Sequence, residues 1–377
     1  MTTYWDNSIL LILFILFSLS AVIQLFYYLY FFLSLWFYKH TSDGNDKPPV
    51  SVIICARNEE KNLKEHLPAI LEQDYPDYEV IVVNDCSEDG TYNVLGEYLQ
   101  RYPRLRVSNL SKDPKFTHNK KFAQFIGVKA AKNEFLLFTD ADCKPVSDKW
   151  IEKMSSAFKK DTELVLGYGG YMSRKGLLNK YIRYDTLMIA MQYFGMAIRK
   201  IPYMGVGRNL AYRRDLFFRN RGFGSHSHLN SGDDDLFVNS VATFRNTAVE
   251  FRPEAHTRSV PSATFASWFS QKSRHLTTAR YYKLTHKILL ITEPASRFLF
   301  YSLFILLASA QYLIPFLVAV FSARFLVQAT IIHLSCKKLD EKGLTVYSLI
   351  FDIFSPLINS IIYISNYFNR SGKNRWK

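Results

Sequence analysis

Long uncharged segments at both ends of the chain constrain its fold more than any other feature. Residues 9–37 contain no charged side chain, and this run exceeds the roughly 20 apolar residues that cross a bilayer as a helix. Residues 298–323 form a second uncharged run, and residues 345–364 form a third that only Asp352 interrupts. The first run is too long for a signal-peptide core and no small-residue cleavage site follows it, so we expect a permanent anchor.

The part of the chain between these runs is polar and carries most of the charge. The predicted organisation is therefore a membrane anchor at 1–46, a water-soluble domain at 47–290, and a membrane region of two or three segments at 291–377. Within the last region, residues 298–334 can form one long helix with an interfacial tail, or a hairpin that is broken near Pro315. A helix is broken at proline because the ring removes a backbone N–H and clashes with the preceding turn.

The formal net charge of +14 is concentrated next to the apolar runs, at residues 39–40, 272–287 and 373–377. By the positive-inside rule this distribution places the soluble domain in the cytoplasm. The sequence has no helix-turn-helix, zinc-finger or RNA-binding signature, so we expect membrane lipid rather than nucleic acid as the partner of the basic surface.

The first part of the soluble domain alternates apolar strands with amphipathic helices. Asn58 is expected to cap the first helix, with Glu59 and Glu60 in its first turn and a kink or break at Pro68. The alternation predicts an α/β fold with a parallel sheet and helices on both faces. The expected strands are 50–55, 80–83, 105–107 and 135–139.

Acidic residues follow two of these strands at their carboxyl ends, where open α/β sheets bind ligands. Asp85 ends the second strand, and Asp140 and Asp142 end the fourth, in the segment FLLFTDADC. Two carboxylates one residue apart are typical ligands of Mg²⁺ or Mn²⁺. The sequence thus predicts a metal site at Asp140 and Asp142, against the alternative of a solvated turn.

A second acidic cluster lies in the segment GDDDLF at Asp233, Asp234 and Asp235. Three adjacent carboxylates must be solvated, bound to metal, or shifted in pKa. One of them is a candidate general base for a sugar hydroxyl; the alternative is an acidic loop at a helix start.

Further along, Gln271 and Arg274 share one face of a basic amphipathic helix.

In this order, the motifs ARNEE, NDCSEDGT, TDADC, GRNLAY, GDDDLF and QKSRH resemble those of membrane-bound family 2 glycosyltransferases with a GT-A fold. The resemblance covers about residues 49–282 and extends to the synthases of cellulose, chitin and hyaluronan and to ceramide glucosyltransferases. It implies that Asp140 and Asp142 hold the metal and that Asp234, within one residue of register, is the base. It also implies a nucleotide and diphosphate site formed by Asp85, Lys121, Asp140, Gln271, Arg274, Asn58 and Glu59.

Two positions depart from the family pattern. The family usually has two acids before its GS turn, and this chain has Asn84, Asp85 and Cys86 there. His275 stands where the last motif usually has Trp. That Trp lines the acceptor path in the polymer-forming enzymes, so processive synthesis by this chain is in doubt.

The resemblance implies an inverting, metal-dependent hexosyl- or N-acetylhexosaminyltransferase of a bacterial inner (cytoplasmic) membrane. Its expected cofactor is Mn²⁺ or Mg²⁺, its donor a nucleoside-diphosphate sugar such as a UDP-sugar, and its acceptor a lipid or polysaccharide hydroxyl. The alternatives are a membrane phosphosugar or nucleotidyl transferase and a non-catalytic nucleotide-sugar-binding membrane protein.

Overall fold

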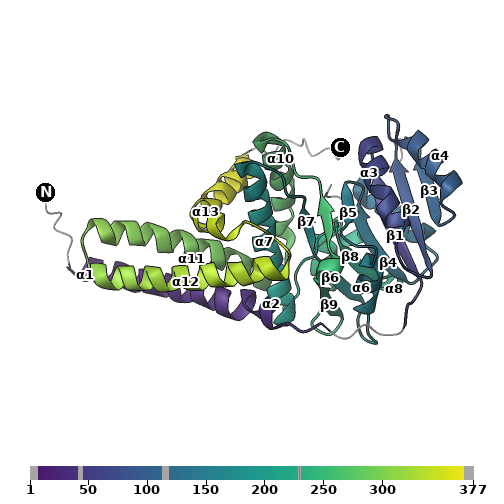
Figure 1. Ribbon diagram of the computed structural model, residues 1–377. Helices are drawn as coiled ribbons and strands as arrows, with labels where there is room; N and C mark the ends of the chain where they lie inside the picture. Colours follow the sequence, from purple (N-terminus) through teal and green to yellow (C-terminus); the bar gives the residue numbers. More distant parts are fainter. Residues whose placement is uncertain (1–6, 41–45, 113–118, 228, 230, 369–377) are drawn as a thin grey trace.

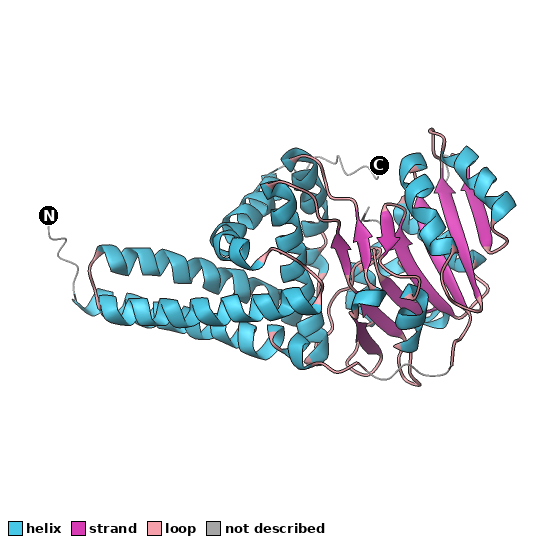
Figure 2. Ribbon diagram, in the orientation of Figure 1, coloured by secondary structure: helices cyan, strands magenta, loops and turns pink. Residues whose placement is uncertain are grey.

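A computed structural model describes residues 7–40, 46–112, 119–227, 229 and 231–368. The molecule consists of an α/β domain and an elongated bundle of apolar helices that extends from one side of it (Figure 1). The strands gather in the α/β domain, and the bundle is helical (Figure 2). The sheet belongs to the central part of the chain, and the bundle combines helices from both ends (Figure 1). This confirms the predicted α/β fold with membrane-type helices on either side of it in sequence.

The main sheet has seven strands in the order β3-β2-β1-β4-β8-β6-β9. The first four in this order are parallel, whereas β8 is antiparallel to both of its neighbours. The sheet is therefore mostly parallel, as expected, and its antiparallel strand β8 lies beyond the segment whose alternation suggested the fold. The strands are β1 Val50–Ala56, β2 Tyr78–Asp85, β3 Leu105–Leu110, β4 Phe135–Asp140, β6 Leu164–Gly167, β8 Leu210–Arg213 and β9 Thr247–Glu250.

A second, three-stranded sheet in the order β5-β10-β7 adjoins the end of β4. Strand β5, Cys143–Pro145, begins directly after Asp142 and pairs with β10, Thr257–Ser259, in antiparallel fashion. Strand β7, Gly169–Tyr171, pairs with β10 on its other side. The second sheet therefore fixes the chain immediately after the Asp140–Asp142 pair.

Helices cover both faces of the main sheet, because side chains of each strand alternate between two apolar cores. Val52 and Val80 face the core that contains α3, α4 and α6, and Ile53 and Ile81 face the core that contains α5 and α7. The helices of the domain are α3 Glu60–Leu71, α4 Thr91–Arg101, α5 Lys120–Ala130, α6 Trp150–Ser156, α7 Leu177–Ile198, α8 Arg214–Arg219, α9 Asp235–Val241 and α10 Phe265–Leu276. Short 3₁₀ segments lie at Gly224–His226, Pro253–Ala255 and Ala279–Tyr281.

Helix α3 continues through Pro68 instead of breaking there. Proline leaves the carbonyl four residues earlier, that of Lys64, without its helical N–H donor. The hydroxyl of Tyr98 on α4 donates to this carbonyl at 3.1 Å. A tertiary hydrogen bond thus replaces the missing helical one.

The N-cap of α3 also differs from the prediction. The N-cap residue is Glu59, and the Asn58 side chain accepts instead from the backbone N–H of Glu88 at 2.8 Å.

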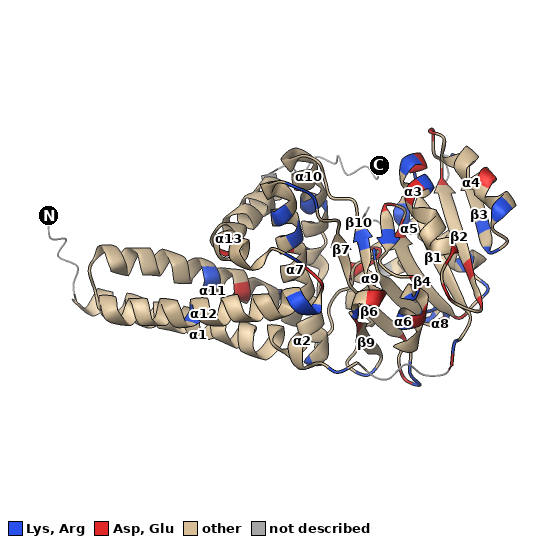
Figure 3. Ribbon diagram, viewed as in Figure 1, with Lys and Arg blue, Asp and Glu red and all other residues tan. Residues whose placement is uncertain are grey.

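Four helices in the described part of the chain are long and apolar enough to cross a membrane. The first span, Asn7–Phe37, comprises α1 Asn7–Phe26, a π-helical turn Tyr27–Phe32, and α2 Ser34–Phe37. The others are α11 Leu284–Ser309, α12 Ile314–Lys338 and α13 Thr345–Phe368. Of the two alternatives for residues 298–334, the hairpin is therefore observed, with Pro315 in the first turn of α12. Figure 3 shows few charged residues along α1, α11 and α12 compared with the α/β domain.

The connection between α12 and α13 fastens the bundle to the α/β domain through one buried carboxylate. Glu341 is 2% exposed and accepts hydrogen bonds from Arg183 Nε on α7 at 2.8 Å and from the Tyr168 hydroxyl at 2.9 Å. Arg258 of β10 pairs with the same carboxylate. Because the ion pairs are buried and hydrogen-bonded, removing either partner leaves an uncompensated charge, so this contact orients the bundle firmly.

Candidate active site

The carboxyl edge of the main sheet presents the predicted acidic pair. Asp140 is the last residue of β4 and lies in register with Cys55 of β1, and Asp142 follows at the start of the second sheet. One ligand atom each from Asp140, Asp142 and Cys143 lie within 4.8 Å of one another. Burial, and then the negative charge of Asp140, raises the pKa of Asp142. A cation between the two carboxylates relieves this repulsion.

The chemistry of this donor set fits a hard divalent cation. Burial holds the pKa of the Cys143 thiol well above its usual range, so the sulfur stays protonated and donates to Asp142 Oδ1 at 3.4 Å. A protonated thiol is a poor metal ligand, whereas paired carboxylates with room for water and phosphate oxygens suit Mg²⁺ or Mn²⁺. Asp140 and Asp142 are therefore the residues that would hold such an ion.

A lysine connects the acidic pair to the acidic triplet. Lys120, at the first position of α5, places its Nζ 2.9 Å from Asp140 Oδ1 and 2.9 Å from Asp233 Oδ2. Burial alone would lower the pKa of Lys120, but Asp140, Asp233 and Asp234 hold it well above its usual value. A small cavity beside this ammonium is lined by Asp140, Asp233 and Gly207, among others. The two acidic clusters, about 90 residues apart in sequence, therefore belong to one site.

The three aspartates of the triplet have different surroundings. Asp233 is 7% exposed and paired with Lys120, and Asp235 is 8% exposed and accepts from the Tyr282 hydroxyl at 2.6 Å and from Thr278. Asp234 is half-buried, and within the described residues its carboxylate is held through backbone groups, with Oδ2 accepting from Gly207 N–H at 2.6 Å and Oδ1 from Asp235 N–H at 2.7 Å. Asp234 is thus the member of the triplet that is open to a ligand.

The electrostatic surroundings give Asp234 the properties of a proton acceptor near neutral pH. Burial, followed by the charges of Asp233 and Asp235, raises the pKa of Asp234 to about 7, and Lys120 and the Gly207 N–H oppose the rise. For Asp233, burial would raise the pKa, but Lys120 lowers it below its usual value. A base works best when its pKa lies near the working pH, and Asp234 meets that condition.

Arg208, in the segment GRNLAY, is a site residue that the sequence analysis did not select. Its guanidinium lies over the ring of Tyr171 at 4.3 Å. Burial alone would lower the pKa of Arg208, but Tyr171, Cys143 and the two carboxylates Asp140 and Asp142 raise it. Its Nη1 is buried and has no hydrogen-bond partner among the described residues. A buried, unpaired guanidinium N–H beside a candidate metal site is suited to an anionic ligand.

Lys121, the lysine predicted at the nucleotide, binds backbone carbonyls, although Asp233, Asp234 and Asp235 lie near enough to oppose the fall in its pKa. Its Nζ donates to the carbonyls of His226 and Leu229 at 2.6 and 3.0 Å, and burial lowers its pKa to about 8. It is Lys120 that faces the acids, since neighbouring residues on a helix are about 100° apart. In the segment that Lys121 holds, His226 is 5% exposed; His228 lies outside the described residues.

Asn58 and Glu59 follow β1, the neighbour of β4, and Asp85 ends β2, two strands away from β4. Asp85 is fully buried, with Arg57 Nη1 3.8 Å from its Oδ2. The Asn58 N–H donates to Ser87 Oγ at 2.9 Å, which joins the loop after β1 to the loop after β2. These three residues therefore lie together at the same sheet edge, apart from Asp140 and Asp142. Their contact with the base of a nucleotide stays a prediction.

Helix α10 brings the last predicted residues to the other side of the acidic pair. Gln271 accepts from Ser262 Oγ at 3.2 Å and hydrogen-bonds with Tyr171, the residue beneath Arg208. Arg274 lies one turn further along α10 and is half-buried. Helix α10 is held on α7 by the buried pair of Lys272 and Asp185, with an N–O distance of 2.6 Å.

Comparison with known proteins shows which proteins the α/β domain is similar to. Residues 51–219 match the profile of glycosyl transferase family 2. The chain is 30% identical over 141 residues to a putative teichuronic acid biosynthesis glycosyltransferase, TuaG, of Bacillus subtilis (37% of this chain, 54% of TuaG). It is 25% identical over 251 residues to a probable glycosyltransferase, YdaM, of the same organism (63% of this chain, 56% of YdaM). The chain thus spans about half the length of these relatives.

A solved structure with a similar fold is the mannosyltransferase PcManGT from Pyrobaculum calidifontis, in complex with GDP-Man and Mn²⁺. The TM-score is 0.58 and the sequence identity 18%, and the match covers 92% of this chain and 98% of that one. At this level of identity the likeness concerns the fold. It extends over both the α/β domain and the helices that flank it.

Proposed function

Since residues 51–219 form a family 2 glycosyltransferase domain, we propose that the protein transfers a hexosyl or N-acetylhexosaminyl group from a nucleoside-diphosphate sugar to a lipid or glycan hydroxyl. The proposal places the reaction at the cytoplasmic face of the membrane, with inversion at the anomeric carbon. The observation that carries it is the single site made by Asp140, Asp142, Arg208 and Asp234.

The donor side of this site is the carboxylate pair with Arg208. Asp140 and Asp142 would hold Mn²⁺ or Mg²⁺, which offsets the charge of a leaving diphosphate. The unpaired Nη1 of Arg208 is positioned to donate to a diphosphate oxygen, and Gln271 supports it through Tyr171. Asp85 and the loop with Asn58 and Glu59 would contact the nucleoside. A UDP-sugar is the donor we expect.

The acceptor side is Asp234. Its carboxylate takes the proton of the acceptor hydroxyl as the hydroxyl oxygen forms a bond to the anomeric carbon. The bond from that carbon to the diphosphate oxygen breaks, and the electron pair leaves with the nucleoside diphosphate. The N–H groups of Gly207 and Asp235 fix the orientation of Asp234 during this transfer.

A panel experiment tests the proposal. Membranes that contain the full chain are incubated with radiolabelled nucleotide sugars and Mn²⁺, and lipid and polymer products are separated. We expect one donor to label a product with release of a nucleoside diphosphate, and activity to disappear with a chelator and return with Mn²⁺ or Mg²⁺.

The matched variant is Asp142→Asn, which keeps the size of the side chain, removes a predicted metal ligand and is expected to lose activity. Turnover that persists in metal-free buffer, or in this variant, contradicts the metal assignment. Release of a nucleoside monophosphate or pyrophosphate instead identifies a phosphosugar or nucleotidyl transferase. Donor binding without any product from membranes with native lipids favours a non-catalytic binding protein.

A further inference from the structure

The last apolar helix, α13, buries polar side chains together with Phe351 and Ile362 on one face and exposes large apolar side chains on the other. Ser348 and Asp352 are fully buried and Ser355 is 5% exposed, and these positions recur at helical spacing. On the opposite face, large apolar residues are 43–72% exposed. They are Val346, Ile350, Phe354, Leu357, Ile361 and Ile364. This arrangement fits a helix that faces protein on one side and lipid on the other.

Both ends of α13 are fastened to helices of the α/β domain. Near its start, the ring of Tyr347 lies 3.7 Å from Lys180 Nζ on α7. Near its end, Asn366 Nδ2 donates to the carbonyl of Ser273 on α10 at 2.8 Å, and the two side chains also hydrogen-bond. With 24 residues, α13 is about 36 Å long, enough to cross a bilayer. A helix that crosses cannot keep both ends on the catalytic domain.

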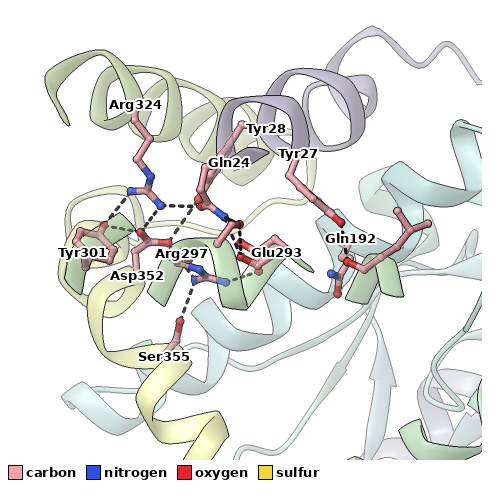
Figure 4. Close-up of polar contacts among 12 residues, drawn as sticks. Gln24, Tyr27, Tyr28, Gln192, Glu293, Arg297, Tyr301, Arg324, Asp352 and Ser355 are labelled. Atoms are coloured by element: carbon pink, nitrogen blue, oxygen red, sulfur yellow. Dashed lines mark hydrogen bonds and ion pairs between the residues drawn. The ribbon is translucent and has the colours of Figure 1, made fainter. Parts of the chain in front are cut away.

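The middle of α13 is held against the bundle by a buried polar network, which we define as the Asp352 network (Figure 4). Asp352 accepts from Arg324 Nη2 on α12 at 2.7 Å, from Arg297 Nη1 on α11 at 3.0 Å and from the Tyr301 hydroxyl at 2.6 Å. Arg324 also donates to Gln24 of α1 at 3.0 Å. The network therefore ties all three bundle helices to one side of α13.

The direction of α13 agrees with these contacts. Helices α1, α11 and α12 run side by side along the length of the bundle, and their α11–α12 turn lies at the end far from the sheet (Figure 1). Helix α13 runs at a steep angle across the half of the bundle that is nearer the sheet, toward α10 (Figure 1).

We propose that α13 does not cross the membrane but lies in the plane of the leaflet on the catalytic-domain side, with its apolar outer face in contact with lipid. Of the four candidate helices in the described part of the chain, Asn7–Phe37, α11 and α12 then cross the membrane, and the end of α13 lies on the same side as the catalytic domain. The Lys and Arg residues that follow α13 in the sequence, at 370–377, agree with this placement, because the positive-inside rule assigns basic residues to that side.

Cysteine labelling with a membrane-impermeant maleimide tests the proposal in the full chain. Ser371→Cys reports the end of the chain, Ser309→Cys the α11–α12 turn, and Lys47→Cys the catalytic-domain side. Each variant is labelled in intact cells and in inside-out vesicles, with the wild type as background for the native cysteines. We expect Ser371→Cys to label like Lys47→Cys, in inside-out vesicles only. We expect Ser309→Cys to label in intact cells only.

The outcomes are distinct. Labelling of Ser371→Cys from the same side as Ser309→Cys means that α13 spans the membrane and overturns the proposal. A further variant, Ile361→Cys, tests lipid contact: it should resist labelling from either side, and reaction in inside-out vesicles would show that the outer face meets water. These readouts report position alone, so they are independent of the proposed glycosyl transfer.

Discussion

At the scale of single residues, the acidic triplet shows how surroundings separate identical side chains. Asp233 is neutralised by Lys120 and Asp235 is occupied by Tyr282 and Thr278, so Asp234 is the carboxylate with capacity to accept a proton. Sequence reasoning predicts a base at Asp234 to within one residue of register. The contacts favour the middle residue because its two neighbours already have partners.

We predict that Asp234→Asn lowers kcat by about 10²-fold or more, the range expected for a lost general base. Affinity for the donor should stay near the wild-type value, because the side chain keeps its size and the donor contacts lie elsewhere. Isothermal titration with the nucleotide and steady-state kinetics separate the two effects. Asp215→Asn, an exposed acid on α8, serves as the control. Equal loss of donor binding would assign Asp234 to the donor site instead.

The raised pKa of Asp234 predicts a pH dependence. Only the ionised carboxylate accepts a proton, and its pKa is about 7, so kcat/KM should fall by about tenfold per pH unit below pH 7 and level off above it. The measurement is a pH profile of kcat/KM between pH 5 and 9, at a fixed metal concentration. A flat profile through pH 6 contradicts the assignment of this group as the base.

For Arg208 we expect a loss of binding. Arg208→Gln removes a charged donor aimed at the diphosphate, and such hydrogen bonds contribute about 1.5–3 kcal/mol, so the Kd of the donor should rise about 10- to 100-fold. Binding of the free nucleoside, which lacks phosphates, should be unchanged. Arg245→Gln, on the surface between α9 and β9, is the control variant. An unchanged Kd for the nucleoside diphosphate in Arg208→Gln would exclude the diphosphate role.

At the scale of elements, two adjacent lysines in the first turn of α5 make different contacts. Lys120 joins the acidic clusters of β4 and the α9 start, and Lys121 holds the carbonyls of the segment at 226–229. The sequence shows only the pair KK. Which lysine faces the site depends on the rotation of α5 about its axis, and this rotation is set by packing of Ala123 and Val128 on the sheet.

The two lysines provide a matched pair of variants. Lys120→Met should reduce kcat strongly, because it removes the charge that balances Asp140 and Asp233. Lys121→Met should act mainly on the segment that it holds, with faster backbone hydrogen exchange around residues 223–229 and a smaller change in kcat. Exchange mass spectrometry and kinetics on both variants give the comparison. If Lys121→Met reduced kcat strongly and Lys120→Met did not, the result would favour Lys121 as the lysine at the nucleotide.

At the scale of the whole molecule, Glu341 joins the helical bundle to the catalytic domain, and the Asp352 network joins α13 to α1, α11 and α12. We predict that Asp352→Asn lowers the apparent Tm of the purified protein, because breaking a buried ion pair from one side costs about 3–5 kcal/mol. The double variant Asp352→Asn with Arg324→Gln should recover part of the loss, since it removes the unpaired guanidinium. Asp340→Asn, an exposed acid in the α12–α13 connection, should leave the Tm unchanged.

The contradicting result is a double variant that is less stable than Asp352→Asn alone by the full cost of Arg324→Gln. Such additivity would mean that Arg324 and Asp352 do not interact, because coupled residues deviate from additive effects.

The sequence alone determined the α/β class, the long apolar helices and the metal-type pair at the end of β4. These features depend on local periodicity: a buried strand needs a continuous apolar run, and carboxylates directly after it must lie at the sheet edge. It did not give the direction of β8, which runs antiparallel to its neighbours, and it did not foresee that Tyr98 would supply a hydrogen bond that Pro68 removes from α3.

Only the tertiary structure decided which side chains share the site. Lys120, Arg208 and Asp234 come from three segments whose spacing carries no signal, and their roles arise from charges that act through space rather than along the chain. The direction of α13 has the same origin. Hydropathy measures the transfer of a segment from water to lipid, and it contains no information on the angle at which contacts such as Asp352 and Asn366 hold that segment.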